Sequence, residues 1–374
     1  MKPLQERFLS LDVFRGMTLC FMIIVNTPGS GATAFGILEH APWHGFTPTD
    51  LVFPSFLFAV GNAMSFSMKK FSQMDNSEVL LKIFKRSFLI FIIGYLMHWF
   101  PFFNYGEGGQ ILSKPFASTR IPGVLQRIAL CFGIASLMIH YLSSKTVIWI
   151  SIVFLAGYWC SLLLFGIPGA ELSMTGNAGL LLDKFILGDA HLYKGEGIPF
   201  DPEGILSTIP AVVNVIIGYY AGKFIQEKGK GYESIAKLML AGGLMVVIAL
   251  IWHMVFPINK KLWSSSFVLV SCGIDLLLIG GLLYLIEIKQ YIRWTRFFVV
   301  FGRNPLFIFI LSGMLMKVVN TIFPNAHVFK WINVHFYQVI APGAMGSLLF
   351  ALSFMLVCWL VGLFLDRKKI YIRV

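Results

Sequence analysis

Charged residues are scarce in this chain of 374 residues. Asp, Glu, Lys and Arg together make up 13% of it, whereas hydrophobic residues make up 57%. Soluble domains are about 25% charged, so this scarcity excludes an ordinary soluble globular protein. The mean hydropathy of +0.77 instead indicates an all-α protein, a polytopic transmembrane helical bundle.

Cysteine is also scarce, and its spacing excludes two further classes. The five cysteines fall singly inside apolar runs and form no CxxC pair. We therefore expect neither a disulfide framework nor a zinc site, and we predict no metal. The N-terminal region lacks the small-residue cleavage site of a signal peptide, and its first apolar run contains Asp12 and Arg15. No internal repeat is evident, which gives an inverted-repeat transporter no support.

What the chain does have is a series of long apolar runs. Each is long enough to cross about 30 Å of hydrocarbon at 1.5 Å per residue. We expect about ten spans in a single transmembrane domain over 1–374, approximately at 10–27, 51–68, 84–101, 121–142, 146–165, 205–225, 235–256, 263–287, 297–319 and 346–365.

The net charge of +12 is spread over short clusters between these runs, which argues against nucleic acid as a partner. Nineteen of the 30 Lys and Arg residues fall in one alternate set of connecting segments and seven in the other. The positive-inside rule then predicts that both termini are cytoplasmic. Two long loops, at about 166–204 and 320–345, are predicted on the outer side. Their aromatic and acidic residues suit a polar ligand, although Trp331 and Tyr337 fit an interfacial aromatic belt equally well.

The segment from Leu38 to Asp50 concentrates polar groups between two apolar runs. It contains two histidines, a tryptophan and two acidic residues within thirteen positions. Titratable groups are costly to place near lipid, so this cluster indicates a functional site. The charge distribution predicts that it faces the outer side.

Histidines 40 and 44 are four residues apart, the spacing of one helix face. Pro42 and Gly45 make a regular helix unfavourable there, so a two-histidine metal site has little support. Either histidine could simply form a hydrogen bond at the membrane interface. Asp50 favours catalysis by His40 or His44, because a carboxylate can fix the tautomer of an imidazole and raise its basicity. Asp50 could also cap the helix that follows it.

Asn26 ends the first apolar run. Its amide is suited to donate a hydrogen bond to a carbonyl or an oxyanion. Pro28 and Gly29 follow, so helix termination is the alternative explanation of this polar residue.

Several arginines lie within apolar runs, where charge is costly. Asp12 lies three residues before Arg15 and could pair with it, and Pro305 breaks the run beside Arg303. Buried arginines suit an anionic ligand from the cytoplasm, whereas paired structural charges are the competing interpretation. The candidates for binding such a ligand are Arg15, Arg86, Arg127, Arg303 and Asn304.

Four blocks of sequence have a recognisable pattern. They are Arg7–Gly16 with Val25-Asn26, His40-Ala41-Pro42-Trp43, Gly45, Thr47 and Asp50–Pro54; then Arg120–Arg127; then Asp201–Ile209; and then Asn259–Ser264. In this order they resemble the heparan-alpha-glucosaminide N-acetyltransferase family, a branch of the transmembrane acyltransferases. Family members transfer an acetyl group from cytoplasmic acetyl-CoA to a glucosamine amine on the far side of the membrane.

The resemblance implies roles for individual residues. His40, in the His-Ala-x-Trp motif, is the expected catalytic histidine, acting as general base or acetyl carrier. Asn26 is its expected partner and would stabilise the oxyanion, and Asp50 is the supporting acid. For the acceptor sugar we expect contacts from Trp43, His44, Asp201 and Glu203.

The sequence departs from the lysosomal members in two ways. Its first apolar run begins about ten residues in, so we expect a bacterial-type member without their lumenal domain, in the inner membrane. His44 stands where asparagine is expected, which leaves the acceptor open: an amino sugar of a glycan or of the envelope. Two alternatives are an O-acetyltransferase of an envelope polysaccharide and a transporter. The oligomeric state is open, a homodimer included.

Overall fold

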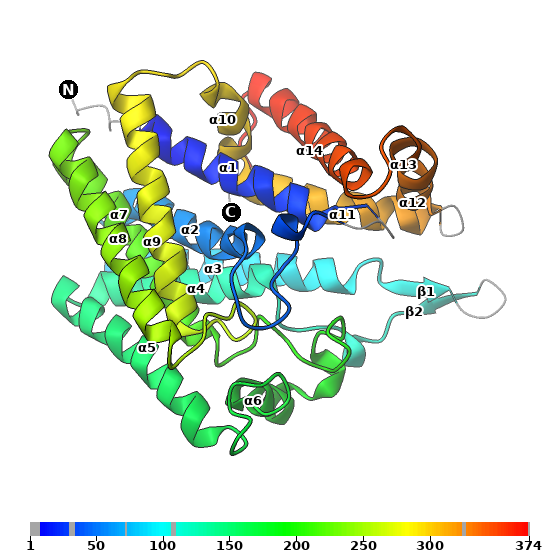
Figure 1. The fold of residues 1–374 in the computed structure, drawn as a ribbon, viewed down its shortest axis with the longest axis horizontal. Helices are drawn as coiled ribbons and strands as arrows, with labels where there is room; N and C mark the ends of the chain where they lie inside the picture. Colours follow the sequence, from blue (N-terminus) through cyan, green and yellow to red (C-terminus); the bar gives the residue numbers. More distant parts are fainter. Residues whose placement is uncertain (1–7, 30–33, 72, 106–109, 324–326, 373–374) are drawn as a thin grey trace. The chain divides into compact units, whose positions relative to one another are not determined.

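The computed structural model describes residues 8–29, 34–71, 73–105, 110–323 and 327–372 (Figure 1). Arg7 of the first sequence block, and Lys2 and Arg373 of the charge distribution, lie outside these ranges. The chain divides into two compact units. Unit 1 comprises Met1–His40, Thr47–Phe56 and Gly281–Arg373, and unit 2 comprises Ala41–Phe46, Leu57–Gly280 and Val374. These units interleave along the sequence, and the expectation of a single domain over 1–374 stays a prediction.

Unit 1 is built around α1 (Leu9–Asn26), which packs against α10 (Thr295–Arg303) and α14 (Ala344–Arg367). A glycine allows the backbones of α1 and α10 to touch, because a Cβ added at Gly16 would lie 1.9 Å from the carbonyl oxygen of Phe298. Small residues commonly mediate such close contacts between membrane helices. The remaining elements of unit 1 are α11 (Pro305–Ile322), α12 (Val328–Ile332), α13 (Gln338–Ile340), two 3₁₀ helices (Gly36–Leu38 and Pro48–Leu51) and two π-helical turns (Leu283–Ile288 and Asn333–Tyr337).

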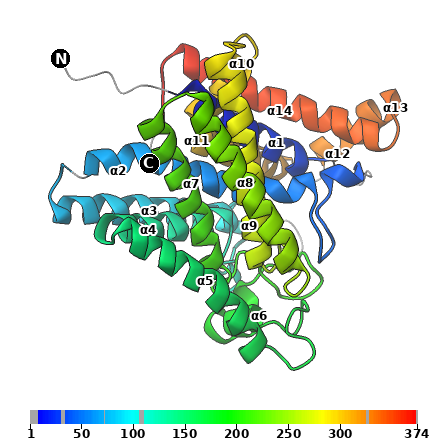
Figure 2. The same ribbon diagram turned by 60° about the vertical axis from the view of Figure 1, so that its left-hand side comes forward.

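Unit 2 is a helical bundle formed mainly by residues 57–280. In it α3 (Asn76–Trp99) and α4 (Val124–Tyr141) lie side by side (Figure 2), and both α4 and α5 (Ser144–Phe165) pack against α7 (Thr208–Lys228). The unit also holds α6 (Ala178–Leu187), α8 (Tyr232–His253), most of α2 (Val52–Phe71) and α9 (Ser265–Leu282), and a hairpin of β1 (Phe103–Tyr105) and β2 (Ile111–Ser113).

The fold confirms the predicted all-α, polytopic class. Within the described ranges, nine helices are long and apolar enough to cross a membrane. The sequence predicted about ten spans, and the difference is α3. It has 24 residues, but Lys82, Lys85 and Arg86 lie in its first half, so it is less apolar than the others.

The predicted span at 297–319 is divided in two. Asn304 leaves the helical conformation between α10 and α11, and Pro305 begins α11, a position that suits its missing N–H. The predicted long loops also contain short helices. Asn177 caps α6 by accepting a hydrogen bond from the Leu180 backbone N–H at 2.8 Å, and α12 and α13 lie in the second loop.

Candidate active site

A histidine–carboxylate pair lies in unit 1 just before α2. The Nδ1 atom of His40 is 2.7 Å from Oδ1 of Asp50. The carboxylate side chain is 1% exposed, whereas the imidazole side chain is 43% exposed. An ionised carboxylate can only accept hydrogen bonds, so it holds the imidazole proton on Nδ1. The lone pair is then on Nε2 of His40, the nitrogen remote from Asp50.

A short turn fixes this carboxylate. The backbone N–H of Thr47 donates to Oδ2 of Asp50 at 3.0 Å, as in a capping box. The hydroxyl of Thr47 donates to the Glu39 carbonyl at 2.8 Å, and the hydroxyl of Thr49 donates to the Ile37 carbonyl at 3.1 Å. Asp50 therefore caps the 3₁₀ helix that leads into α2 and also orients His40. The two threonines hold the segment carrying His40 against this turn.

Asn26 is the last residue of α1, and its side chain is exposed. Within the described ranges its amide makes no hydrogen bond. Next to it is a small, partly open apolar pocket, lined by Ile24, Val25, Pro28, Ala34, Phe35 and Leu38 together with Ala344, Ser347, Leu348 and Ala351 of α14. Val25, which precedes Asn26, and Leu38, two positions before His40, thus line the same pocket within unit 1.

Trp43 and His44 belong to unit 2. The indole N–H of Trp43 donates to the Leu172 carbonyl at 2.9 Å, and its ring meets Phe200 edge-on at 5.7 Å. His44 is exposed, and its Nδ1 lies 3.3 Å from Nδ2 of Asn259. Burial, and to a smaller extent the nearby His253, lower the pKa of His44. Both rings are thus held in fixed orientations.

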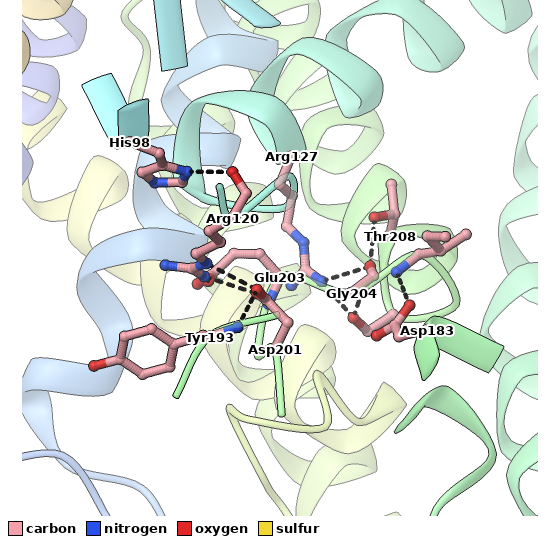
Figure 3. Close-up of polar contacts among 11 residues, drawn as sticks. His98, Arg120, Arg127, Asp183, Tyr193, Asp201, Glu203, Gly204 and Thr208 are labelled. Atoms are coloured by element: carbon pink, nitrogen blue, oxygen red, sulfur yellow. Dashed lines mark hydrogen bonds and ion pairs between the residues drawn. The ribbon is translucent and has the colours of Figure 1, made fainter. Parts of the chain in front are cut away.

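Asp201 and Glu203 are bound to Arg120 (Figure 3). The guanidinium donates to both carboxylate oxygens of Asp201, at 2.8 and 2.7 Å, and to Glu203 at 2.6 Å. It also lies over the Tyr193 ring at 4.7 Å. Asp201 accepts two further backbone hydrogen bonds, from Tyr193 and Glu203. These contacts favour a structural role for the two carboxylates, which fasten the 193–203 segment to the start of α4.

Arg127 joins the same cluster from α4. It is 1% exposed, donates to the Gly204 carbonyl and the Ser207 hydroxyl, and lies over the Trp263 ring at 4.8 Å. Asp183 of α6 accepts the Ile205 N–H at 2.8 Å. Burial raises the pKa of Asp183 to about 7, and the nearby Asp201 contributes in the same direction.

The other candidates for anion binding have protein partners. In unit 1, Arg15 pairs with Asp12 at 3.7 Å and donates to the Gly302 carbonyl at 3.1 Å, while Arg303 pairs with Asp366. The amide of Asn304 binds the backbone of the C-terminal residues 370 and 372. In unit 2, Arg86 lies over the Phe132 ring at 4.6 Å. Six exposed cations of unit 1, to which sequence reasoning gave no binding role, are Lys289, Arg293, Arg296, Arg367, Lys368 and Lys369.

Sequence reasoning missed further residues around the site. Thr47 was quoted only as part of a motif, and Thr49 was not considered. The short spacing of a threonine three residues before an acid is the capping-box signal that could have identified the first. Asn259 could not be found this way, because its contact with His44 joins positions 215 residues apart.

The described chain is thus a polytopic α-helical membrane protein whose unit 1 contains a histidine–carboxylate pair and a small apolar pocket. It belongs to the heparan-alpha-glucosaminide N-acetyltransferase family, because the model of that family's catalytic region matches residues 7–249. It is 28% identical to the human heparan-alpha-glucosaminide N-acetyltransferase over 384 residues, covering 88% of this chain and 55% of the human protein. The mouse protein is also 28% identical, over 381 residues covering 87% of this chain and 55% of its own length. The chain therefore spans about half the length of these relatives.

Proposed function

We propose that this protein is a transmembrane acetyltransferase. It moves an acetyl group from cytoplasmic acetyl-CoA to the amine of a glucosamine-type sugar on the outer side of the membrane. The observation that carries the proposal is the His40–Asp50 pair at 2.7 Å, with a buried carboxylate and a half-exposed imidazole. Family membership and the names of the relatives support the choice of reaction.

The lone pair of His40 Nε2 serves either of two routes. In direct transfer the sugar nitrogen attacks the thioester carbon, the C–S bond breaks, and Nε2 takes the amine proton and passes it to the departing thiolate. In the two-step route Nε2 itself attacks the carbonyl carbon, the C–S bond breaks and CoA leaves as the thiolate. The amine then attacks the acetyl-imidazole, the bond from the acetyl carbon to Nε2 breaks, and the amine proton neutralises the thiolate. Both routes need a neutral His40 with its proton on Nδ1, the arrangement that Asp50 maintains.

Asn26 and the adjoining pocket supply the remaining functions. Each route passes through a tetrahedral oxyanion, and the amide of Asn26 donates to it. Such a donor typically contributes about 3–4 kcal/mol. The apolar pocket, walled by Ala344, Ser347 and Ala351, accepts the methyl group or the adjacent part of the pantetheine arm, because both lack charge.

The phosphates of CoA need cations on the cytoplasmic side. Arg15, Arg303 and Asn304 are each engaged with a partner in unit 1, so a ligand would have to displace those contacts. The exposed cations of the same unit, among them Arg293 and Arg296, are better phosphate ligands, since a surface cation binds without first breaking an ion pair.

A direct assay tests the proposed function. Purified protein in nanodiscs receives radiolabelled acetyl-CoA with glucosamine or with an acceptor that offers only hydroxyls. We expect labelled N-acetylglucosamine from the native protein and none from His40→Ala. Label on the hydroxyl acceptor alone would identify an O-acetyltransferase. Sugar uptake into liposomes without any acetyl transfer would make the protein a transporter.

A further inference from the structure

His44 and Asn259 form a pair in unit 2 whose hydrogen-bond polarity is determined by the backbone. Oδ1 of Asn259 accepts the Leu262 N–H at 2.8 Å, so the atom facing His44 must be the amide nitrogen Nδ2. The orientation of the amide follows from this contact, because a backbone N–H can only donate. Asn259 itself is fully buried, and its own N–H donates to the Ser264 hydroxyl at 3.0 Å.

The polarity of Asn259 determines the tautomer of His44. An amide nitrogen donates, so Nδ1 of His44, 3.3 Å away, must accept. The proton of the neutral ring then lies on Nε2. A protonated ring would place an N–H at Nδ1 opposite the amide N–H, and this conflict disfavours the cation. His44 is therefore the reverse of His40, whose Nε2 carries the lone pair.

An aromatic ring of fixed orientation lies next to His44. Trp43 is partly exposed, and its ring meets His44 at a centroid distance of 6.1 Å with an interplanar angle of 61°. The Gly45 N–H donates to the Ile258 carbonyl at 2.8 Å, which anchors the segment that carries both rings. A rigid aromatic ring beside one oriented polar group is the usual composition of a site that binds a small polar ligand.

We propose that His44, held by Asn259, donates a hydrogen bond from Nε2–H to an oxygen of the acceptor sugar. This inference rests on the proposed function and adds the group that selects the acceptor. A donor on Nε2 suits a hydroxyl or carbonyl oxygen of the sugar, and it cannot serve as the base. Asn259 is a positioning residue, because it acts only through His44.

The tautomer is tested without any substrate. In protein labelled with ¹⁵N-histidine, the His44 resonances are assigned by their absence in His44→Gln. We expect a protonated Nε2 and an unprotonated Nδ1 at neutral pH. In Asn259→Asp the carboxylate still accepts from Leu262 but now accepts from His44 as well, so the proton should move to Nδ1. A native His44 protonated on Nδ1 overturns the proposal.

Kinetics test the contact with the sugar. We expect His44→Phe and Asn259→Asp to raise the KM for glucosamine about three- to tenfold, the usual range for one hydrogen bond, with the KM for acetyl-CoA within about twofold. His44→Gln keeps a side-chain N–H and should retain most of the affinity. The monodeoxy glucosamine that lacks the oxygen contacted by His44 should bind the native protein more weakly than glucosamine does. The same analogue and glucosamine should bind His44→Phe equally well.

A second His–Asn pair in unit 2 provides the matched control. His140 Nε2 lies 2.9 Å from Oδ1 of Asn76, and neither residue has a role in the proposed site. His140→Phe and Asn76→Leu should leave both KM values unchanged. Unaltered glucosamine affinity in correctly folded His44→Phe overturns the proposal, and so does equal loss in His44→Gln.

Direct binding separates this inference from the proposed function. Glucosamine titration into the native protein and His44→Phe, without acetyl-CoA, measures the contact independently of turnover. Binding weakened by His44→Phe without acetyl transfer supports the sugar contact and refutes the acetyltransferase. Turnover that is insensitive to His44→Phe refutes only the contact. If the native protein neither binds glucosamine nor transfers acetyl groups to it, both the sugar contact and the proposed function are refuted.

Discussion

At the scale of single residues, two histidines in one motif differ by what binds Nδ1. Asp50 accepts from His40, and Asn259 donates to His44. The lone pair lies on Nε2 of His40 and the proton on Nε2 of His44, so the first ring is suited to act as a base and the second as a donor. Spacing along the chain could not reveal this, because the partners of the two rings come from different distances in sequence.

Asp50→Asn tests the orientation of His40. The amide cannot favour the Nδ1–H form as a carboxylate does, so Nε2 loses its lone pair for part of the time. We expect kcat to fall about 100-fold or more, within the range for loss of a positioned base. Steady-state kinetics on the purified variant measure it. Asp75→Asn is the control, at an exposed aspartate before α3 whose side chain makes no capping hydrogen bond, and its kcat should stay within a few-fold. If Asp50→Asn kept the kcat of the native protein, the proposed role of Asp50 in orienting His40 as a base would be refuted.

Asn26→Ala tests the oxyanion donor. An interaction made only in the transition state affects kcat and leaves ground-state binding intact. We expect kcat to fall about 10²–10³-fold, with the KM for acetyl-CoA within about twofold. Asn104→Ala, an exposed asparagine on β1, should have no effect. A parallel loss of kcat and acetyl-CoA affinity would assign Asn26 to substrate binding instead.

At the scale of elements, helices bring together parts of the site that are remote in sequence. The end of α1 and the start of α14 are more than 300 residues apart, yet both line the apolar pocket. Small residues on α14 leave that space open.

Ala344→Phe should fill the pocket. We expect acetyl transfer to fall at least about tenfold, because an aromatic ring occupies the space of the acyl group. Leu360→Phe is the matched control on α14, at a side chain that is 58% exposed, and it should retain activity. Gel filtration verifies folding of both. Full activity of a folded Ala344→Phe protein would exclude the pocket from the acyl path.

Asp183 makes the attachment of α6 depend on pH. Its pKa is raised to about 7 in the folded protein from an ordinary value of 3.8, so the folded state binds the extra proton between these values. The contribution of Asp183 to the free energy of unfolding is therefore greatest below about pH 4 and is lost as the pH rises through 7. The full change is up to about 4 kcal/mol, at 1.36 kcal/mol per unit.

Asp183→Asn should remove this dependence. The amide oxygen can still accept the Ile205 N–H, but nothing titrates. We expect the Tm of the native protein in detergent to fall relative to that of Asp183→Asn between pH 5 and 7.5. A constant difference between the two Tm values over that range would show that Asp183 keeps an ordinary pKa.

At the scale of the whole molecule, topology depends on α3. Two cytoplasmic termini require an even number of crossings, and nine helices within the described ranges meet the length and composition of a span. We predict that α3 is the tenth, with Lys82, Lys85 and Arg86 extending their charges toward the cytoplasmic surface.

Cysteine labelling on intact cells tests this topology in a Cys160→Ala background. Ala117→Cys, after α3, should react with an impermeant maleimide, whereas Ser144→Cys, at the start of α5, should react only after lysis. Both positions are exposed. Protection of Ala117→Cys in intact cells would place α3 on one side of the membrane, and the termini would then lie on opposite sides.

The sequence by itself determined the all-α membrane class, the family, and the cluster that contains His40, His44 and Asp50. Each follows from local information: apolar runs of fixed length, motif order, and titratable residues gathered within thirteen positions. Nothing local predicted that Asp50 would bind His40 rather than His44, that Arg120 would engage Asp201 and Glu203, or that Arg303 would pair with Asp366. Only the tertiary structure decided these contacts and the tautomer of His44, because they depend on which distant backbone groups reach each side chain.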